Sequence, residues 1–265
     1  MEEASRVLIS ESGDIRTAPF PPSKEFPLGS DRDGHDILSH LIVGAKDTFL
    51  IILAICFIRY VLAIPLGLIA SRRKNIFSSL LSIWNLLFSS VPPIFSAMIL
   101  LSIPMLVMSE NRLYVSILIL ALFEVGKVGY IVQQEANAVM KKPFIEAGVT
   151  VGVTPLKQLI NHVLPNITSV IVVNFFVDIG RTALLIGQMG IFGIFISQVY
   201  IQTGSFVAEM SNTSFYWMTL LGQARDDIMN AIWIPIYTSL AITFTIFTFN
   251  ILGEGLRRYF GRETL

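Results

Sequence analysis

Residues 146–166 read EAGVTVGVTPLKQLINHVLPN and form a polar, glycine-punctuated segment between two long apolar runs. We expect residues 141–150, at the start of this segment, to form a short amphipathic helix. Gly152 and Pro155 then interrupt this helix, because glycine permits turns closed to other residues and proline cannot continue a helix. A second helix is expected to resume over 156–164. Two short helices that brace each other predict a rigid projection, which the groove of a partner protein can grip.

The composition outside this segment is that of an all-α polytopic membrane protein. Of the 265 residues, 53% are hydrophobic and only 14% are charged, whereas a soluble domain carries about 25% charged residues. Several apolar runs reach the roughly 20 residues that a helix needs to cross a bilayer. Residues 1–40 contain no apolar core long enough for a signal peptide.

The apolar runs predict about five transmembrane helices, at about 48–70, 77–107, 114–131, 167–186 and 231–252. Lysine and arginine cluster in the 71–75 loop, the 132–165 loop and the C-terminal tail. With five spans these three segments lie on one side, which the excess of basic residues identifies as cytoplasmic. The first 45 residues hold twice as many acidic as basic side chains and are expected on the outside.

Residues 184–200 are apolar and almost continuous with the fourth predicted span. A sixth span there would move the arginine-rich C-terminus away from the other basic segments. We therefore interpret 184–200 as a helix break followed by a re-entrant or surface segment, which Gly187, Gly190 and Gly193 permit. Irregular backbone at that depth must be buried in protein or line a cavity.

Charged residues inside the spans are costly there and mark either paired or functional positions. Glu124 and Lys127 lie three residues apart, as do Asp178 and Arg181, so each acid is expected to neutralise its basic neighbour on one helix face. Arg59 has no such neighbour in its own span. Two interpretations stay open for Arg59, Glu124 and Asp178: they line the pathway of a polar substrate, or they form buried structural pairs.

Several motifs are absent from the sequence. It contains no G-x-x-x-x-G-K-[ST] loop, no H-E-x-x-H and no G-x-S-x-G, so no catalytic residue is predicted. His35 and His40 lie near three aspartates, but their spacing matches no recognised ligand pattern, and no metal site is predicted. The single cysteine, Cys56, excludes a disulfide within the chain. No basic patch with interleaved aromatic residues points to nucleic acid.

The 146–166 segment resembles the coupling loop of bacterial ABC-importer permeases, whose signature is E-A-A, a glycine four residues later and L-P thirteen residues after that glycine. The matching residues, including a histidine typical of the peptide/nickel branch, are Glu146, Ala147, Gly148, Gly152, His162, Leu164 and Pro165. Gly148 stands where the family usually has alanine. In the family this loop docks on the ATPase subunit, and the residue matching Glu146 helps to hold the loop's own fold together.

Two further stretches carry the same resemblance. Residues 27–46, PLGSDRDGHDILSHLIVGAK, are similar to the P-L-G-T-D-x-x-G-R-D signature of the C-type permease of dipeptide/oligopeptide/nickel importers, with His35 in place of an arginine. Ser30 or Asp31 is expected to cap an interfacial helix there. Residues 249–257, FNILGEGLR, resemble the family's F-N-L-L-G-D-G-L-R ending. C-type permeases normally have a further span before the first signature, and we expect this chain to lack it.

The resemblance implies a type I ABC-importer permease fold with a cytoplasmic coupling helix, in the bacterial plasma membrane. The expected organisation is an extracytoplasmic segment over 1–45, a transmembrane domain over 46–257 with its coupling loop at 135–166, and a cytoplasmic tail over 258–265. Expected partners are a homologous B-type permease, two ATP-binding subunits, an extracytoplasmic substrate-binding protein and the lipid bilayer. The chain itself holds no cofactor, because ATP and Mg²⁺ bind the ATPases.

The resemblance further implies that the chain forms half of the translocation pore of an ATP-driven importer of peptides, or of nickel or metallophore-type solutes. Two alternatives stay open. An ion-gradient-driven secondary transporter would use Arg59, Glu124 and Asp178 as coupling residues, although no internal repeat is visible in the sequence. A non-transporting scaffold derived from a permease would bind ATPases and move nothing.

Overall fold

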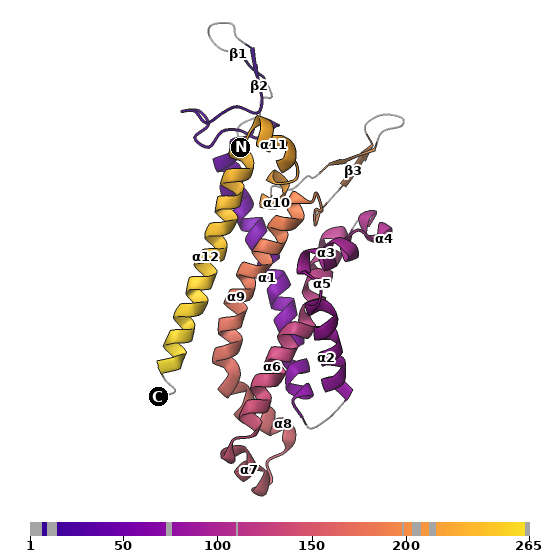
Figure 1. Cartoon of the computed structure of the whole chain (residues 1–265), viewed down its shortest axis with the longest axis vertical. Helices are drawn as coiled ribbons and strands as arrows, with labels where there is room; N and C mark the ends of the chain where they lie inside the picture. The colour runs from indigo at the N-terminus through magenta and orange to yellow at the C-terminus, as the bar shows by residue number, and fades with distance from the viewer. Residues whose placement is uncertain are drawn as a thin grey trace. The chain divides into compact units, whose positions relative to one another are not determined.

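The computed structural model describes residues 7–9, 15–72, 76–109, 111–197, 199–202, 208–211 and 216–262. Its regular elements are mostly helices (Figure 1). The helices are α1 (Ile37–Ala70), α2 (Ile76–Ser89), α3 (Pro93–Leu101), α4 (Pro104–Val107), α5 (Arg112–Leu122), α6 (Val125–Met140), α7 (Pro143–Thr150), α8 (Pro155–Gln158), the π-helix η1 (Leu159–Val163), α9 (Leu164–Ile191), α10 (Trp217–Leu220), α11 (Ala224–Asn230) and α12 (Trp233–Arg262).

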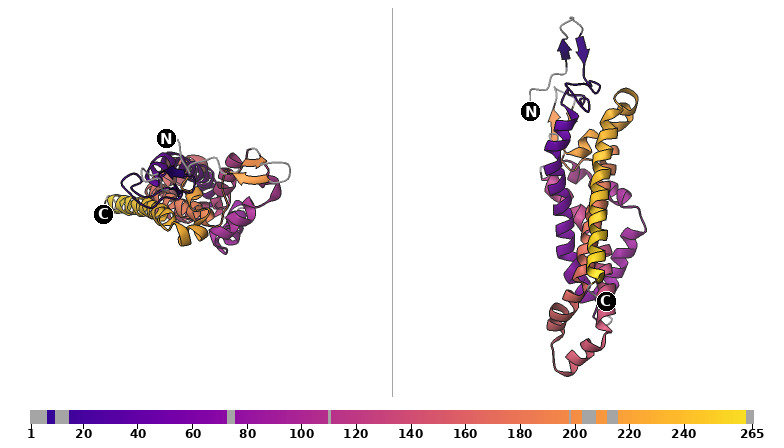
Figure 2. Two further views of the ribbon diagram at one scale, coloured as in Figure 1. Left: turned by 90° about the horizontal axis from the view of Figure 1, so that it is seen from above. Right: turned by 90° about the vertical axis from the view of Figure 1, so that its left-hand side faces the viewer.

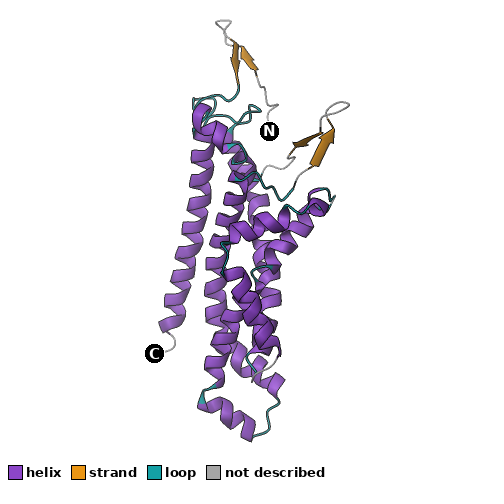
Figure 3. Cartoon of the chain, turned by 45° about the vertical axis from the view of Figure 1, so that its right-hand side comes forward, coloured by secondary structure: helices purple, strands orange, loops and turns teal. Residues whose placement is uncertain are grey.

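The strands form two short antiparallel pairs (Figure 3). β1 (Val7–Ile9) pairs with β2 (Ile15–Thr17), and β3 (Val199–Gln202) pairs with β4 (Ala208–Ser211). Two-stranded ribbons of this length add little stability of their own. The fold therefore depends on the helices, in agreement with the all-α expectation.

The structure has four candidate spans, or five if one bent helix pair counts as a span, against the predicted five. Four helical stretches are long and apolar enough to cross a membrane: 37–70, 112–140, 155–191 and 233–260. α2 and α3 pass the same test together, but they meet at an angle of 95°. The single helix predicted over 77–107 is therefore wrong. Proline lacks a backbone N–H and restricts the residue before it, so Pro93 and Pro104 each begin a new helix.

The predicted break at the end of the fourth span is also displaced. α9 continues through Gly187 and Gly190 to Ile191, and the backbone first turns at Gly193, whose φ of +68° lies in the left-handed region. The two earlier glycines serve packing instead. A Cβ added to Gly190 would lie 2.5 Å from the carbonyl oxygen of Met218, so only glycine lets that backbone approach.

The first span begins earlier than predicted, and no separate interfacial helix precedes it within residues 15–36. Its start is set by Asp36, not by Ser30 or Asp31. The Asp36 carboxylate accepts hydrogen bonds from the Ser39 backbone N–H at 2.9 Å and from the Ser39 hydroxyl at 2.8 Å. Such a cap satisfies donors that the first turn of a helix leaves free.

The chain divides into two compact units. Unit 1 comprises residues 1–52, 101–116 and 183–246. In it the indole N–H of Trp217 donates to the Leu41 carbonyl at 2.8 Å, which fixes α10 on the first turns of α1. One buried apolar cluster of this unit contains Ile37, Leu41, Trp217, Leu220, Leu221, Ala231, Ile234 and Ile242.

Unit 2 comprises residues 53–100, 117–182 and 247–265. Glycines on α6 let neighbouring helices come close. A Cβ on Gly126 would meet the Trp84 ring of α2 at 2.7 Å, and one on Gly67 of α1 would meet the Gly129 carbonyl oxygen at 2.5 Å. Two buried clusters follow from this packing. One surrounds Tyr60 and Val128, and the other runs from Leu68 and Val132 to Leu159 and Ile167.

Candidate functional site

Residues 143–158 fold as a helix–turn–helix projection, made of α7, a turn and α8. Figure 2 shows α7 and α8 joined by their turn at one end of unit 2. Pro143 begins α7 and Pro155 begins α8, each at a position where the missing N–H costs nothing. Gly152 has a φ of +84°, a conformation that glycine adopts without strain. The predicted helix, interruption and second helix are confirmed.

Gln158 braces the two helices of this projection. Its side chain is buried and donates a hydrogen bond of 2.8 Å to the carbonyl oxygen of Ile145 on α7. No signal in the sequence pointed to Gln158, because it follows Lys157 in a polar stretch and its burial depends on the packing of α8 against α7. A Cβ at Gly148 would lie 3.7 Å from the Gln158 amide nitrogen. This is ordinary contact, so either the glycine present or the alanine usual in the family fits.

The other predicted coupling residues surround this brace. Glu146, Ala147, Gly152, His162 and Pro165 are exposed, and Leu164 is half-buried. The resemblance led us to expect a bracing role for Glu146, but the described hydrogen bond between the two helices comes from Gln158. Exposed apolar side chains also cover the projection, and one of them, Val151, is 84% exposed. The others are Phe144, Val149, Leu156 and Ile160.

The projection joins α9 through the π-helix η1. Pro165 lies one residue into α9 and cannot donate to the preceding turn. The wider η1 turn comes directly before it, and Leu164 N–H donates to the Leu159 carbonyl. The Asn166 amide adds a hydrogen bond of 2.8 Å to the His162 carbonyl. α8, η1 and α9 therefore continue as one helical stretch from the projection into the span.

A buried ion network lies in unit 2, where α1, the α5–α6 junction and α9 meet. The Arg59 side chain is 0% exposed. Its guanidinium lies 2.6 Å from an Asp178 carboxylate oxygen and 2.8 Å from a Glu124 carboxylate oxygen. It also donates to the Leu120 carbonyl at 2.9 Å and to the Thr182 hydroxyl at 3.3 Å. Three charged residues from separate segments thus satisfy one another.

These contacts show which of the charged residues form pairs. Glu124 does lie near Lys127, at 3.8 Å. Asp178, however, binds Arg59 on another helix, so the predicted neutralisation by Arg181 is wrong. Three ionisable residues in separate spans were the signal for such a cross-helix network. Arg59, Glu124 and Asp178 are all buried against one another, and a role in lining the pathway stays a prediction for them.

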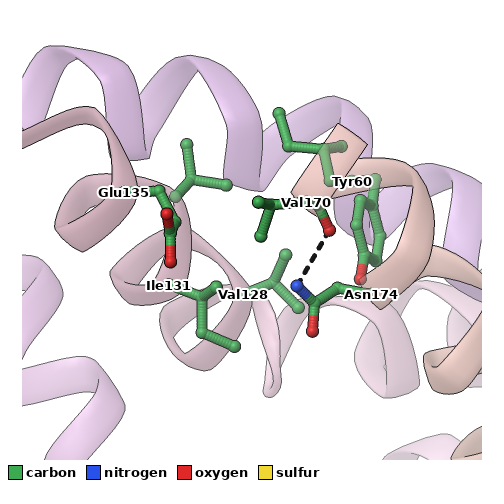
Figure 4. A pocket seen from close by; sticks show the side chains of 8 residues that line it. Tyr60, Val128, Ile131, Glu135, Val170 and Asn174 are labelled. Carbon is green, nitrogen blue, oxygen red and sulfur yellow. Dashed lines mark hydrogen bonds between the residues drawn. The ribbon is translucent and has the colours of Figure 1, made fainter. Parts of the chain in front are cut away.

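A narrow cleft lies beside this network in unit 2 (Figure 4). It has room for about one water-sized sphere, with a volume of about 10 Å³. Its polar side chains come from α1, α6 and α9: Tyr60, Glu135 and Asn174. Asn174 donates a hydrogen bond of 2.9 Å to the Val170 carbonyl of its own helix. The remaining lining is apolar and consists of Val128, Ile131, Val132, Val170 and Ile171.

The N-terminal segment of unit 1 is organised around Asp31. Backbone N–H groups of Asp33 and His35 donate to one carboxylate oxygen at 2.9 and 2.8 Å. The imidazoles of His35 and His40 lie 3.3 and 3.4 Å from the other oxygen. Burial alone would raise the pKa of the Asp31 carboxyl, but His40 and the His35 N–H hold it below its ordinary value. Among the described residues, no three histidine, cysteine or acidic side chains are grouped to hold a metal ion.

A second acid in unit 1, Asp227 of α11, is buried beside Arg32. The guanidinium donates to the Asp227 carboxylate at 2.8 Å. Burial raises the pKa of Asp227, and the hydrogen bond from Arg32 only partly opposes this. The ion pair joins α11 to the segment that precedes α1.

The chain has clear relatives among known proteins. Residues 63–265 match the family described as "Binding-protein-dependent transport system inner membrane component". The glutathione transport system permease protein GsiD of Escherichia coli O6:K15:H31 (strain 536 / UPEC) is 27% identical over 238 residues, covering 89% of this chain and 72% of the relative. The GsiD proteins of Shigella boydii serotype 4 and Shigella sonnei show the same identity and coverage. The matched region contains the α7–α8 projection and most of the ion network.

Proposed function

Because this chain belongs to the family of inner membrane components of binding-protein-dependent transport systems, we propose that its α7–α8 projection is the surface on which an ATPase subunit acts. The chain is a multi-pass membrane permease subunit of an ABC importer and is not itself catalytic. The family description implies that a partner permease, an ATPase and a binding protein complete the system. In our proposal these are a homologous B-type permease, two ATP-binding subunits and an extracytoplasmic binding protein.

The proposal rests on one observation: the α7–α8 projection is held rigid by an internal hydrogen bond and has exposed apolar side chains. The buried Gln158 hydrogen bond and the Gly152 turn make α7 and α8 one rigid piece. Val149 and Val151 stay exposed on it, outside the candidate spans, and Leu156 is exposed on α8. Exposed apolar groups of this kind mark interaction surfaces. The chain contains no P-loop, and in our proposal the ATPase subunit that binds ATP docks on this surface.

The mechanism follows from the connection of the projection to the spans. α8 continues through η1 into α9, so a displacement of the projection moves the span without an intervening flexible loop. ATP-driven closure of the two ATPases would push the two permeases' projections together. This would shift the pore from an inward-facing to an outward-facing state. ATP can bias that equilibrium only through contacts that differ between the two states.

For the cargo we propose peptides. The relatives reported above are named for the transport of glutathione, which is a tripeptide. Nickel or metallophore-type solutes remain the other cargo class of this proposal. Membership of the binding-protein-dependent family speaks against the ion-gradient-driven alternative, which would need no ATPase.

The proposal is tested with variants of the assembled importer that carry a charged side chain on the α7–α8 projection. In Val151→Lys, a charge replaces the most exposed apolar side chain of the projection, and Gly152→Asp puts a side chain where φ is positive. We expect both variants to reach the membrane but to lose ATPase stimulation by loaded binding protein, by about tenfold or more. Arg258→Gln, an exposed change on α12, is the matched control. Normal stimulation and uptake in both projection variants would overturn the proposal.

A further inference from the structure

The buried ion network joins three candidate spans at one level. Arg59 belongs to α1, Glu124 lies at the α5–α6 junction, and Asp178 belongs to α9. All three side chains are buried, and both carboxylates contact the same guanidinium nitrogen, at 2.8 and 2.6 Å. Sliding one of these helices past the others would leave charges unpaired in an apolar interior, where they are costly. The network therefore opposes such sliding.

Buried apolar layers continue from the ion network to the α7–α8 projection. Next to the charges, Tyr60 of α1 clusters with Val125 and Val128 of α6, and Phe175 of α9 packs against them. A second cluster joins the same three helices to α7 and η1: Leu68, Val132, Ala136, Val139, Ile145, Leu159, Val163 and Ile167. All of these residues belong to unit 2. One packed block therefore extends from the projection to the ion network.

The helices of this block are joined to α1 in two different ways. α6 approaches α1 closely at Gly67, and the buried Gln133 side chain donates to the Ala70 carbonyl, at the end of α1, at 3.1 Å. The described hydrogen bonds between α9 and α1, in contrast, come from Asp178 and Thr182 of α9. Both of these residues contact Arg59. The polar attachment of α9 to α1 thus depends on the ion network.

We infer that Arg59 is a positioning residue for coupling: by holding Asp178 and Glu124, it keeps α9 fixed to α1 and to the α5–α6 junction in both states of the importer. The role in coupling rests on the proposed function, whereas the fixed spacing of the helices does not. A displacement of the projection enters α9 through α8 and η1. With the network intact, α1 and α6 move by the same amount. Without it, α9 moves alone and the displacement is lost within the subunit.

The native cysteine offers a direct test of the fixed spacing. The sulfur of Cys56 on α1 lies 3.4 Å from the Thr182 hydroxyl oxygen on α9, beside the network. In Thr182→Cys, two sulfurs would lie close enough for the roughly 2 Å bond of a disulfide after a small side-chain adjustment. Iodine, which crosses membranes, oxidises the two thiols to the disulfide and is itself reduced to iodide, with the release of two protons. Cys56→Ser combined with Thr182→Cys is the control that cannot crosslink.

We expect the disulfide to form in the assembled importer, as measured by mass spectrometry. Uptake of glutathione by the crosslinked importer should stay within about twofold of the reduced sample, because α1 and α9 keep their spacing throughout the cycle. Two outcomes would overturn the inference. One is failure of Thr182→Cys to crosslink with Cys56. The other is a loss of uptake on crosslinking that a reductant reverses, which would show that the two helices separate during transport.

The role of the charges is tested by removing them together. Arg59→Leu combined with Glu124→Gln and Asp178→Asn leaves no unpaired charge in the network. The readout is the amount of glutathione taken up per ATP hydrolysed. A loss of folded importer lowers uptake and hydrolysis together and leaves this ratio unchanged. We expect the triple variant to lower the ratio by about tenfold, whereas Arg258→Gln, the loss of an exposed positive charge, should not change it.

A covalent bond should then replace the ionic one. When Thr182→Cys is added to the triple variant and oxidised, the disulfide with Cys56 ties α9 to α1 again, and we expect the ratio to recover. A normal ratio in the triple variant, or no recovery after crosslinking, would overturn the role of Arg59. Normal stimulation in Val151→Lys and Gly152→Asp would instead overturn the proposed function. The crosslinking yield would still stand, because it depends only on the spacing of α1 and α9.

Discussion

Replacing Arg59 by leucine removes the only cation at the centre of the buried ion network. Asp178 and Glu124 would keep their burial but lose the guanidinium at 2.6 and 2.8 Å. The Leu120 carbonyl would also lose its side-chain donor. Glu124 keeps Lys127 at 3.8 Å, so the loss falls mainly on Asp178.

The magnitude follows from leaving a buried charge without its partner. Removing one member of a buried ion pair costs about 3–5 kcal/mol. For a chain of this size that loss lowers the melting temperature by about 10 °C. A variant that also carries Glu124→Gln and Asp178→Asn should recover most of the loss, because it leaves no uncompensated carboxylate in the interior.

The assay is thermal unfolding of the purified importer in detergent, followed by loss of the monodisperse complex. Arg258→Leu is the matched control, because its pair with Glu254 at 3.2 Å is exposed and such pairs contribute little. A melting temperature of Arg59→Leu within about 2 °C of the wild type would refute the reasoning. So would a triple variant no more stable than Arg59→Leu alone.

Three further predictions concern single contacts. Gly67→Val places a side chain against the Gly129 carbonyl and should destabilise the chain by about 1–3 kcal/mol. The control Gly255→Val, which has open space around it, should not. Equal melting temperatures for the two variants would contradict the predicted clash. Gln158→Leu breaks the brace of the projection at a cost of about 1–3 kcal/mol, and we expect faster proteolysis between α7 and α8, with the rest of the chain intact. Because the pKa of Asp31 is lowered from 3.8, its charge stabilises the fold above that pH and the benefit is lost as the pH falls through the folded value. Asp31→Asn should therefore lower the melting temperature at neutral pH, with a difference from wild type that narrows below 3.8; a difference independent of pH would rule out the charge as its cause.

The local features of this protein could be predicted from the sequence because each depends on a few neighbouring residues. Hydropathy over a window places the spans, and proline and glycine set the ends of α7 and α8 through their own backbones. The i, i+3 contact of Glu124 with Lys127 is local in the same sense. The family's coupling signature lies within one such stretch, which is why it was visible before any fold was considered.

Other features depend on residues far apart in the chain, and only the tertiary structure decided them. Arg59 and Asp178 are separated by 119 residues, so the pair cannot be inferred from spacing. From the sequence, Gly190 was expected to allow a helix break, but it lies within α9. Glycine is needed there because the Met218 backbone occupies the space that a side chain would take. The sequence determined which residues enter the membrane and where the coupling projection begins and ends. Packing between distant segments determined which charges are buried in pairs and which, like Lys127, stay uncovered, because burial and pairing depend on neighbours brought together only by folding.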